Sequence, residues 1–125
     1  MPSRTLGKPE LSNNPIPYIP GWVVGFRGAA INADDAGPDE TKPVALDKSR
    51  FGVGNTAVVD VIASATGVTI TLWAKEGADL ILVSAATTTA NKQRLIFSNL
   101  VAVQHFIQVT GATGKAVTLN VGCTQ

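Results

Sequence analysis

The sequence predicts an all-β protein: a single antiparallel β-sandwich, jelly-roll or immunoglobulin-like, of seven or eight strands, with an extended proline-rich N-terminal arm. Three observations predict this. All seven prolines lie within residues 1–43, so the rest of the chain is free of the residue that strands tolerate least. From residue 21 onward, runs rich in Val, Ile and Thr are separated by turn signals at the spacing typical of sandwiches and barrels. No segment has the apolar period of a long amphipathic helix.

Residues 1–20 are predicted to be the arm, and residues 21–125 the β-sandwich domain. Pro15, Pro17 and Pro20 fix φ and remove backbone donors, which excludes a helix and disfavours a central strand. In a polyproline-like conformation the arm would span on the order of 60 Å. It carries spaced apolar side chains, and we expect three of them and the tryptophan that follows to anchor it on a partner: Ile16, Tyr18, Ile19 and Trp22.

Seven runs in the second region are predicted strands: 21–31, 56–63, 67–75, 79–85, 94–99, 100–110 and 115–122. In 67–75, Val68, Ile70 and Leu72 share one face, with Thr69, Thr71 and Trp73 on the other. Such alternation is typical of a sheet with one face in the core and one in water. In the last run Val117, Leu119, Val121 and Cys123 share a face, so the chain's one cysteine is expected to be a small buried apolar residue.

The segments between these runs are predicted to be loops and turns. Residues 34–43 (DDAGPDETKP) indicate a polar loop with a turn at Gly37 and Pro38. Residues 83–93 contain a threonine triplet that favours a loop over a helix. The related tetrapeptides SATG (64–67) and GATG (111–114) suggest the turns of two hairpins.

Catalytic motifs are missing from the sequence. His105 is the one histidine and shares a face with Ile107 and Val109, which indicates a satisfied histidine at the edge of the core. The stretch GATGKA (111–116) resembles part of a phosphate-binding loop, but two residues separate its glycines instead of four. Ala116 stands where Ser or Thr would bind magnesium. We therefore expect no enzyme, no cofactor and no metal site.

An acidic cluster lies in the predicted polar loop, where Asp34, Asp35, Asp39 and Glu40 place four of the nine acidic residues within seven positions. A solvated loop, or one paired with Lys42, is the interpretation that the pattern favours. A weak calcium site and a salt bridge to a basic partner are the alternatives, although the run does not match an EF-hand loop.

Aromatic residues are the best candidates for binding. Trp73 alternates with Thr69 and Thr71, so its face would be solvent or a partner surface, and exposed tryptophan is typical of interface hot spots. Burial in a second sheet's core is one alternative. A sugar-stacking platform with Trp22 and Tyr18 is another. Phe106 is a further interface candidate.

Charge and hydropathy limit the partners. Charged residues make up 15% of the chain and the net charge is +1, without a basic patch, so nucleic-acid binding is not expected. No apolar run approaches the roughly 20 residues of a membrane span. No secretory signal pattern is visible, so we expect synthesis and assembly in a cytoplasm.

The chain resembles the small decoration (cement) proteins of tailed-phage capsids. The shared features are a proline-containing arm and a cysteine-poor β-domain that is rich in Thr, Val and Gly and low in charge. Residues 67–122 look like the β-sandwich modules of phage virion proteins. The resemblance implies a non-enzymatic virion protein on the outer capsid surface that binds and stabilises the major capsid protein. It also implies self-association as a homotrimer. A carbohydrate- or receptor-binding module and a tail or connector protein are the alternative functions.

Overall fold

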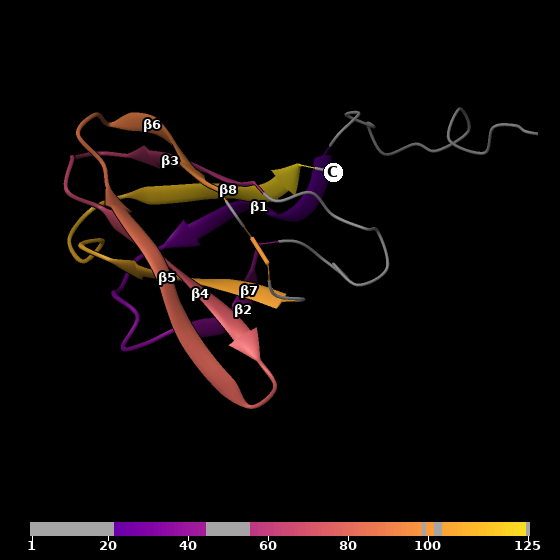
Figure 1. Ribbon diagram of the computed structural model, residues 1–125. Coiled ribbons are helices and arrows are strands. Elements are labelled where there is room, and N and C mark those ends of the chain that lie inside the picture. Colours follow the sequence, from indigo (N-terminus) through magenta and orange to yellow (C-terminus); the bar gives the residue numbers. More distant parts are fainter. Residues whose placement is uncertain (1–21, 45–55, 99, 102–103, 125) are drawn as a thin grey trace, which may run out of the picture.

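Eight strands are formed by the residues that the computed structural model describes, which are 22–44, 56–98, 100–101 and 104–124 (Figure 1). The predicted arm lies outside the described residues. The strands are β1 (Trp22–Ile31), β2 (Asp39–Pro43), β3 (Ala57–Ala63), β4 (Thr69–Glu76), β5 (Asp79–Thr87), β6 (Lys92–Phe97), β7 (Gln104–Thr110) and β8 (Val117–Thr124). The all-β prediction is confirmed.

The strands form two four-stranded sheets in which every pairing is antiparallel. Sheet A has the order β1-β8-β3-β6, and sheet B has the order β2-β7-β4-β5. The pairings are nested along the chain: β1 with β8, β2 with β7, β3 with β6 and β4 with β5. Pairings of β3 with β8 and of β4 with β7 complete the sheets.

The core lies between the sheets and is built from alternate residues of their strands. Val68, Ile70 and Leu72 are fully buried, as the alternation in 67–75 predicts, and the Cys123 thiol is buried as well. Both sheets contribute further fully buried side chains: Val59, Val61, Ile107, Val109, Leu119 and Val121. Each of these aliphatic side chains contributes roughly 1.5–3 kcal/mol by leaving water.

The two predicted hairpins are wrong. Residues 64–67 join β3 to β4, and residues 111–114 join β7 to β8, and in each case the two strands belong to different sheets. The turns lie side by side, since Lys115 Nζ donates to the Thr66 carbonyl at 2.7 Å and Ser64 N donates to the Ala116 carbonyl at 2.9 Å. The same turn residues suit a hairpin or a crossover, so turn chemistry alone cannot separate the two.

Two strands extend into segments predicted to be loops. Asp39–Pro43 forms β2, whose end is fixed by Val44, a buried residue that donates its N–H to the His105 carbonyl at 3.0 Å. Strand β5 continues to Thr87, where the hydroxyls of Thr69 and Thr87 form a cross-strand hydrogen bond of 2.7 Å. In contrast, β7 begins at Gln104 rather than at residue 100.

Candidate protein-binding face

The outer face of sheet B carries a row of apolar side chains that crosses all four strands. In the strand register, Pro43 of β2 lies opposite Phe106 of β7, Phe106 lies opposite Trp73 of β4, and Trp73 lies opposite Leu82 of β5. These four residues are here called the apolar row. Their neighbours Leu72 and Ile107 belong to the core, so alternation along the strands places Trp73 and Phe106 on the face directed away from it.

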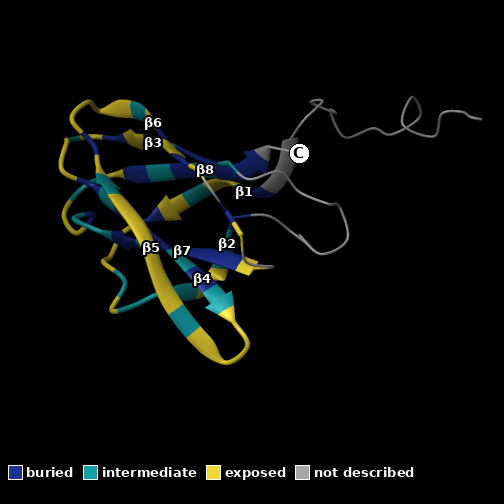
Figure 2. Cartoon of the chain, in the orientation of Figure 1, coloured by how far each residue is buried: buried dark blue, intermediate teal, exposed yellow. Residues whose placement is uncertain are grey.

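Exposure within the apolar row rises from Phe106 toward the β5 edge of the sheet, whereas Pro43 at the β2 edge is half-buried. Phe106 is 6% exposed, Trp73 is half-buried and Leu82 is 59% exposed. Figure 2 shows this trend as a change from the dark blue of β7 to the yellow of β5. The β5 end of the row therefore presents apolar surface to water, while Phe106 in the middle of the sheet is already packed.

The Trp73 indole is held in place by a polar neighbour. Its Nε1 donates to Oε1 of Gln108 at 3.0 Å, and Gln108 lies on β7, two residues along from Phe106. The amide of Gln108 in turn donates to the Asp35 carbonyl at 3.4 Å. A side chain that is already oriented loses less conformational entropy when a partner covers it.

Polar groups flank the apolar row on both sides. Lys75 of β4 pairs with Glu40 of β2 at 2.9 Å, two residues from Trp73 along the strand. On the other side lie Gln108 and the hydrogen-bonded Thr69 and Thr87. An apolar centre with a polar rim is the usual arrangement of a protein–protein interface.

Of the six residues predicted to bind a partner, the structure brings Trp73 and Phe106 together. Ile16, Tyr18 and Ile19 lie outside the described residues. Trp22 begins β1 and pairs in register with Thr124 of β8. Sequence reasoning missed Leu82, because the run DLILVSA resembles a strand that is buried on both faces; its exposure depends on β5 being an edge strand.

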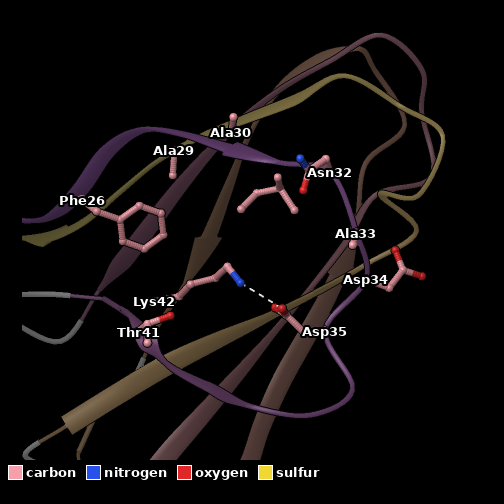
Figure 3. Close-up of a pocket in the computed structure, with 10 residues that line it drawn as sticks. Phe26, Ala29, Ala30, Asn32, Ala33, Asp34, Asp35, Thr41 and Lys42 are labelled. Carbon is pink, nitrogen blue, oxygen red and sulfur yellow. Dashed lines mark hydrogen bonds and ion pairs between the residues drawn. The ribbon is translucent and has the colours of Figure 1, made fainter.

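The acidic loop lines an open cavity of about 440 Å³ on the side of the sandwich where β1 and β2 face each other (Figure 3). Lys42 points into this cavity, and its Nζ pairs with Asp35 at 2.9 Å and with Asp39 at 2.6 Å. The hydrogen bond from Lys42 lowers the pKa of Asp39 from 3.8 to about 2. The predicted pairing of the loop with Lys42 is confirmed.

Asp34 fixes the turn at residues 111–114 instead of facing a ligand. Its Oδ1 accepts hydrogen bonds from the N–H groups of Ala112 at 2.8 Å and Thr113 at 3.1 Å. These N–H groups hold the pKa of Asp34 below its usual value. The carboxylates of Asp34, Asp35 and Asp39 are thus all engaged within the protein, an arrangement that does not favour the calcium alternative.

Sheet A presents a second, more polar outer face. Arg94 of β6 forms a two-pronged ion pair with Asp60 of β3, with contacts of 2.7 and 2.9 Å. This hydrogen bonding holds the pKa of Asp60 below its usual value. Ile62 and Ile96 on the same two strands are exposed. Because the ion pair interrupts the apolar surface, this face is a weaker candidate for binding than the apolar row.

His105 is 2% exposed, in line with the prediction of a core histidine. Across the described ranges no group of three His, Cys, Asp or Glu residues could hold a metal ion. In the same part of the chain no helix is long and apolar enough to cross a membrane.

Comparisons with known proteins identify no relative. A scan of protein-family models, a search of curated proteins and a search of solved structures each found no match to this chain.

Proposed function

We propose that this chain is a non-enzymatic structural protein of a phage virion, which decorates the capsid by binding the major capsid protein through the outer face of sheet B. The observation that carries the proposal is the apolar row, which crosses a whole sheet and ends in Leu82 at 59% exposure. Monomeric proteins rarely leave contiguous apolar surface in water unless a partner covers it. The resemblance to decoration proteins supplies the class of partner.

The order of the strands supports the same proposal. The strand pairs are nested: the first strand pairs with the eighth, the second with the seventh, the third with the sixth and the fourth with the fifth. A long hairpin that rolls into two sheets has this pairing. We infer that the sandwich is a jelly roll. This architecture is common in viral capsid proteins and in lectins. The argument from architecture is an analogy, because one fold can serve many functions.

Truncation of Trp73 tests the binding face. With capsid shells assembled from the major capsid protein of the phage that encodes the chain, we expect Trp73→Ala to weaken binding at least about 30-fold, since truncating a hot-spot residue costs about 2 kcal/mol or more. Binding is measured by co-sedimentation of shells and protein over a range of protein concentrations. Unchanged thermal unfolding of the variant would show that the fold is intact.

Ile96→Ala is the matched control, because Ile96 is 60% exposed but lies on the outer face of sheet A. This variant should bind the shells as the unchanged protein does. Equal losses in both variants would mean that sheet B is not the specific contact. No loss in Trp73→Ala would refute the proposed face.

Deletion of residues 1–20 tests the arm separately. All eight strands lie within residues 22–124, so the shortened chain should retain the β-sheet circular dichroism spectrum and cooperative unfolding of the full chain. It should lose most of its affinity for the shells, because Ile16, Tyr18 and Ile19 are removed together. Full binding by the shortened chain would show that the arm does not contribute.

Sugar binding is the second candidate function, and the half-buried Trp73 beside the amide of Gln108 is the observation that favours it. An aromatic ring beside an amide can stack against a sugar and hydrogen-bond its hydroxyls. A glycan array distinguishes the two functions. Glycan binding that disappears in Trp73→Ala, without binding to capsid shells, would replace the capsid proposal.

A further inference from the structure

Strand β5 differs from the other three sheet edges in having almost no protection against pairing with another strand. Its nine residues, Asp79–Thr87, pair with β4 alone, so one side of its backbone has no partner strand among the described residues. It contains no proline, its one charged residue is Asp79 at the start, and its register with β4 has a single irregularity, beside Val83. Natural edge strands are normally blunted by charge, proline, bulges or short length, since an open edge invites another chain.

The other three edges each carry such protection. Strand β1 has two irregularities in its register with β8, and Arg27 is exposed. Strand β2 has five residues, including Asp39, Glu40 and Pro43. Strand β6 has six residues, and Lys92 and Arg94 on it are exposed. The contrast within one molecule indicates that β5 is the edge meant to be covered.

Apolar side chains of β5 are exposed on both faces of sheet B. Leu82 lies opposite Trp73 and belongs to the outer face, whereas Ile81 lies opposite Ala74 and belongs to the inner face. Ile81 is nevertheless 48% exposed, Leu82 is 59% exposed and Val83 is 39% exposed. A strand added at this edge would cover the side chains of both faces together with the open backbone groups.

We propose that β5 pairs antiparallel with β5 of a second copy of this chain, joining two sheets B into one continuous sheet around a two-fold axis near Val83. The position of the one charge on β5 favours the antiparallel orientation of the second copy. An antiparallel pair places the two Asp79 carboxylates at opposite ends, roughly 27 Å apart at 3.4 Å per residue, whereas a parallel pair would set them side by side.

Other segments of the chain suit this edge less well. The N-terminal arm has prolines at 15, 17 and 20, which lack the N–H donors that a ladder needs. Strand β6 of a second copy would bring Lys92 and Arg94 against the uncharged residues that follow Asp79. A β5–β5 contact is self-complementary and closes at two copies, in contrast to the trimer that the resemblance implies.

The mass of the full-length protein in solution tests the pairing. Light scattering at micromolar concentrations should give twice the 12.9 kDa of one chain. Ile81→Lys should give a monomer, because it places two charges in the new ladder. Ile96→Lys is the matched control, since it makes the same change at a more exposed position on the β6 edge, and it should remain a dimer.

A cysteine pair tests the orientation. Cys123 is buried, so introduced cysteines are the ones free to cross-link. Val83→Cys should form a disulfide-linked dimer on mild oxidation, because residues near the two-fold axis come within the about 7 Å that a disulfide allows between Cα atoms. Asp79→Cys should not. Cross-links in both variants would mean a parallel, in-register pair, in which every residue lies beside its own copy, and would overturn the proposal.

Three outcomes of the mass measurement would also overturn it: a monomer at every concentration, a trimer, or a dimer that persists in Ile81→Lys. The pairing and the proposed capsid function both use Leu82, but their tests are separate. A dimer that fails to bind capsid shells would refute that function and leave the β5 interface standing.

Discussion

Gly111→Ala is expected to lower the free energy of unfolding by about 2–4 kcal/mol, the largest effect we predict for a substitution outside the aliphatic core. Gly111 has a φ of 72°, a conformation that alanine adopts only with strain. A Cβ at this position would also overlap the carbonyl oxygen of Gly67 in the neighbouring turn. Because that neighbour is backbone, neither turn can move aside without disturbing the crossings between the sheets.

Gly114→Ala provides the matched control three residues away. Gly114 has a φ of 81°, but an added Cβ would meet no atom within 4 Å. The free energy of unfolding of this variant should therefore fall only by the conformational strain of about 1 kcal/mol. Urea unfolding of both variants separates the two contributions. Equal losses in the two variants would mean that the contact between the turns contributes nothing.

Gly25→Ala should destabilise the sandwich by about 2–3 kcal/mol through overpacking. Gly25 is buried on β1, and a Cβ there would overlap the carbonyl oxygens of Pro43 and Val44 at the end of β2. At Gly25, an edge strand of sheet A comes close to an edge strand of sheet B, and the contact is between backbone atoms. The substitution would force β1 away from β2 and widen the cavity beside Lys42.

Gly37→Ala is the comparison for Gly25, since an added Cβ at Gly37 would meet no atom within 4 Å. We expect a change within about 0.5 kcal/mol for this variant, as for most surface substitutions. Thermal unfolding of the two variants measures this difference in stability. A Gly25→Ala protein as stable as Gly37→Ala would show that β1 and β2 do not pack closely.

Local patterns in the sequence were enough to find most strands but not their partners. The alternation of Val68, Ile70 and Leu72 predicts both a strand and its buried face, because each residue's environment repeats every two positions. The hairpins expected at 64–67 and 111–114 failed for the opposite reason. Turn residues indicate that the chain reverses direction. The sheet that the next strand joins depends on contacts with strands far away in sequence.

The proposed binding face could be predicted only in part from the sequence. Polar neighbours in β4 correctly placed Trp73 on the outer face, and Phe106 was a candidate from its strand. The register of four strands makes these two rings direct neighbours. The same register places Pro43 and Leu82 on either side of them, which completes the row. The sequence has no local signal for such a row, because its members come from positions 43 to 106.

The place of β8 in sheet A has a consequence for the way the protein is made. Strand β8 lies between β1 and β3, and it is synthesised after every other described strand. While the chain is still growing on the ribosome, β1 therefore lacks the one described strand that it pairs with, and β3 lacks one of its two described partners. Sheet A stays incomplete until residues 117–124 emerge, so the sandwich closes only after they have been translated, at the slow rate typical of folds with distant pairings.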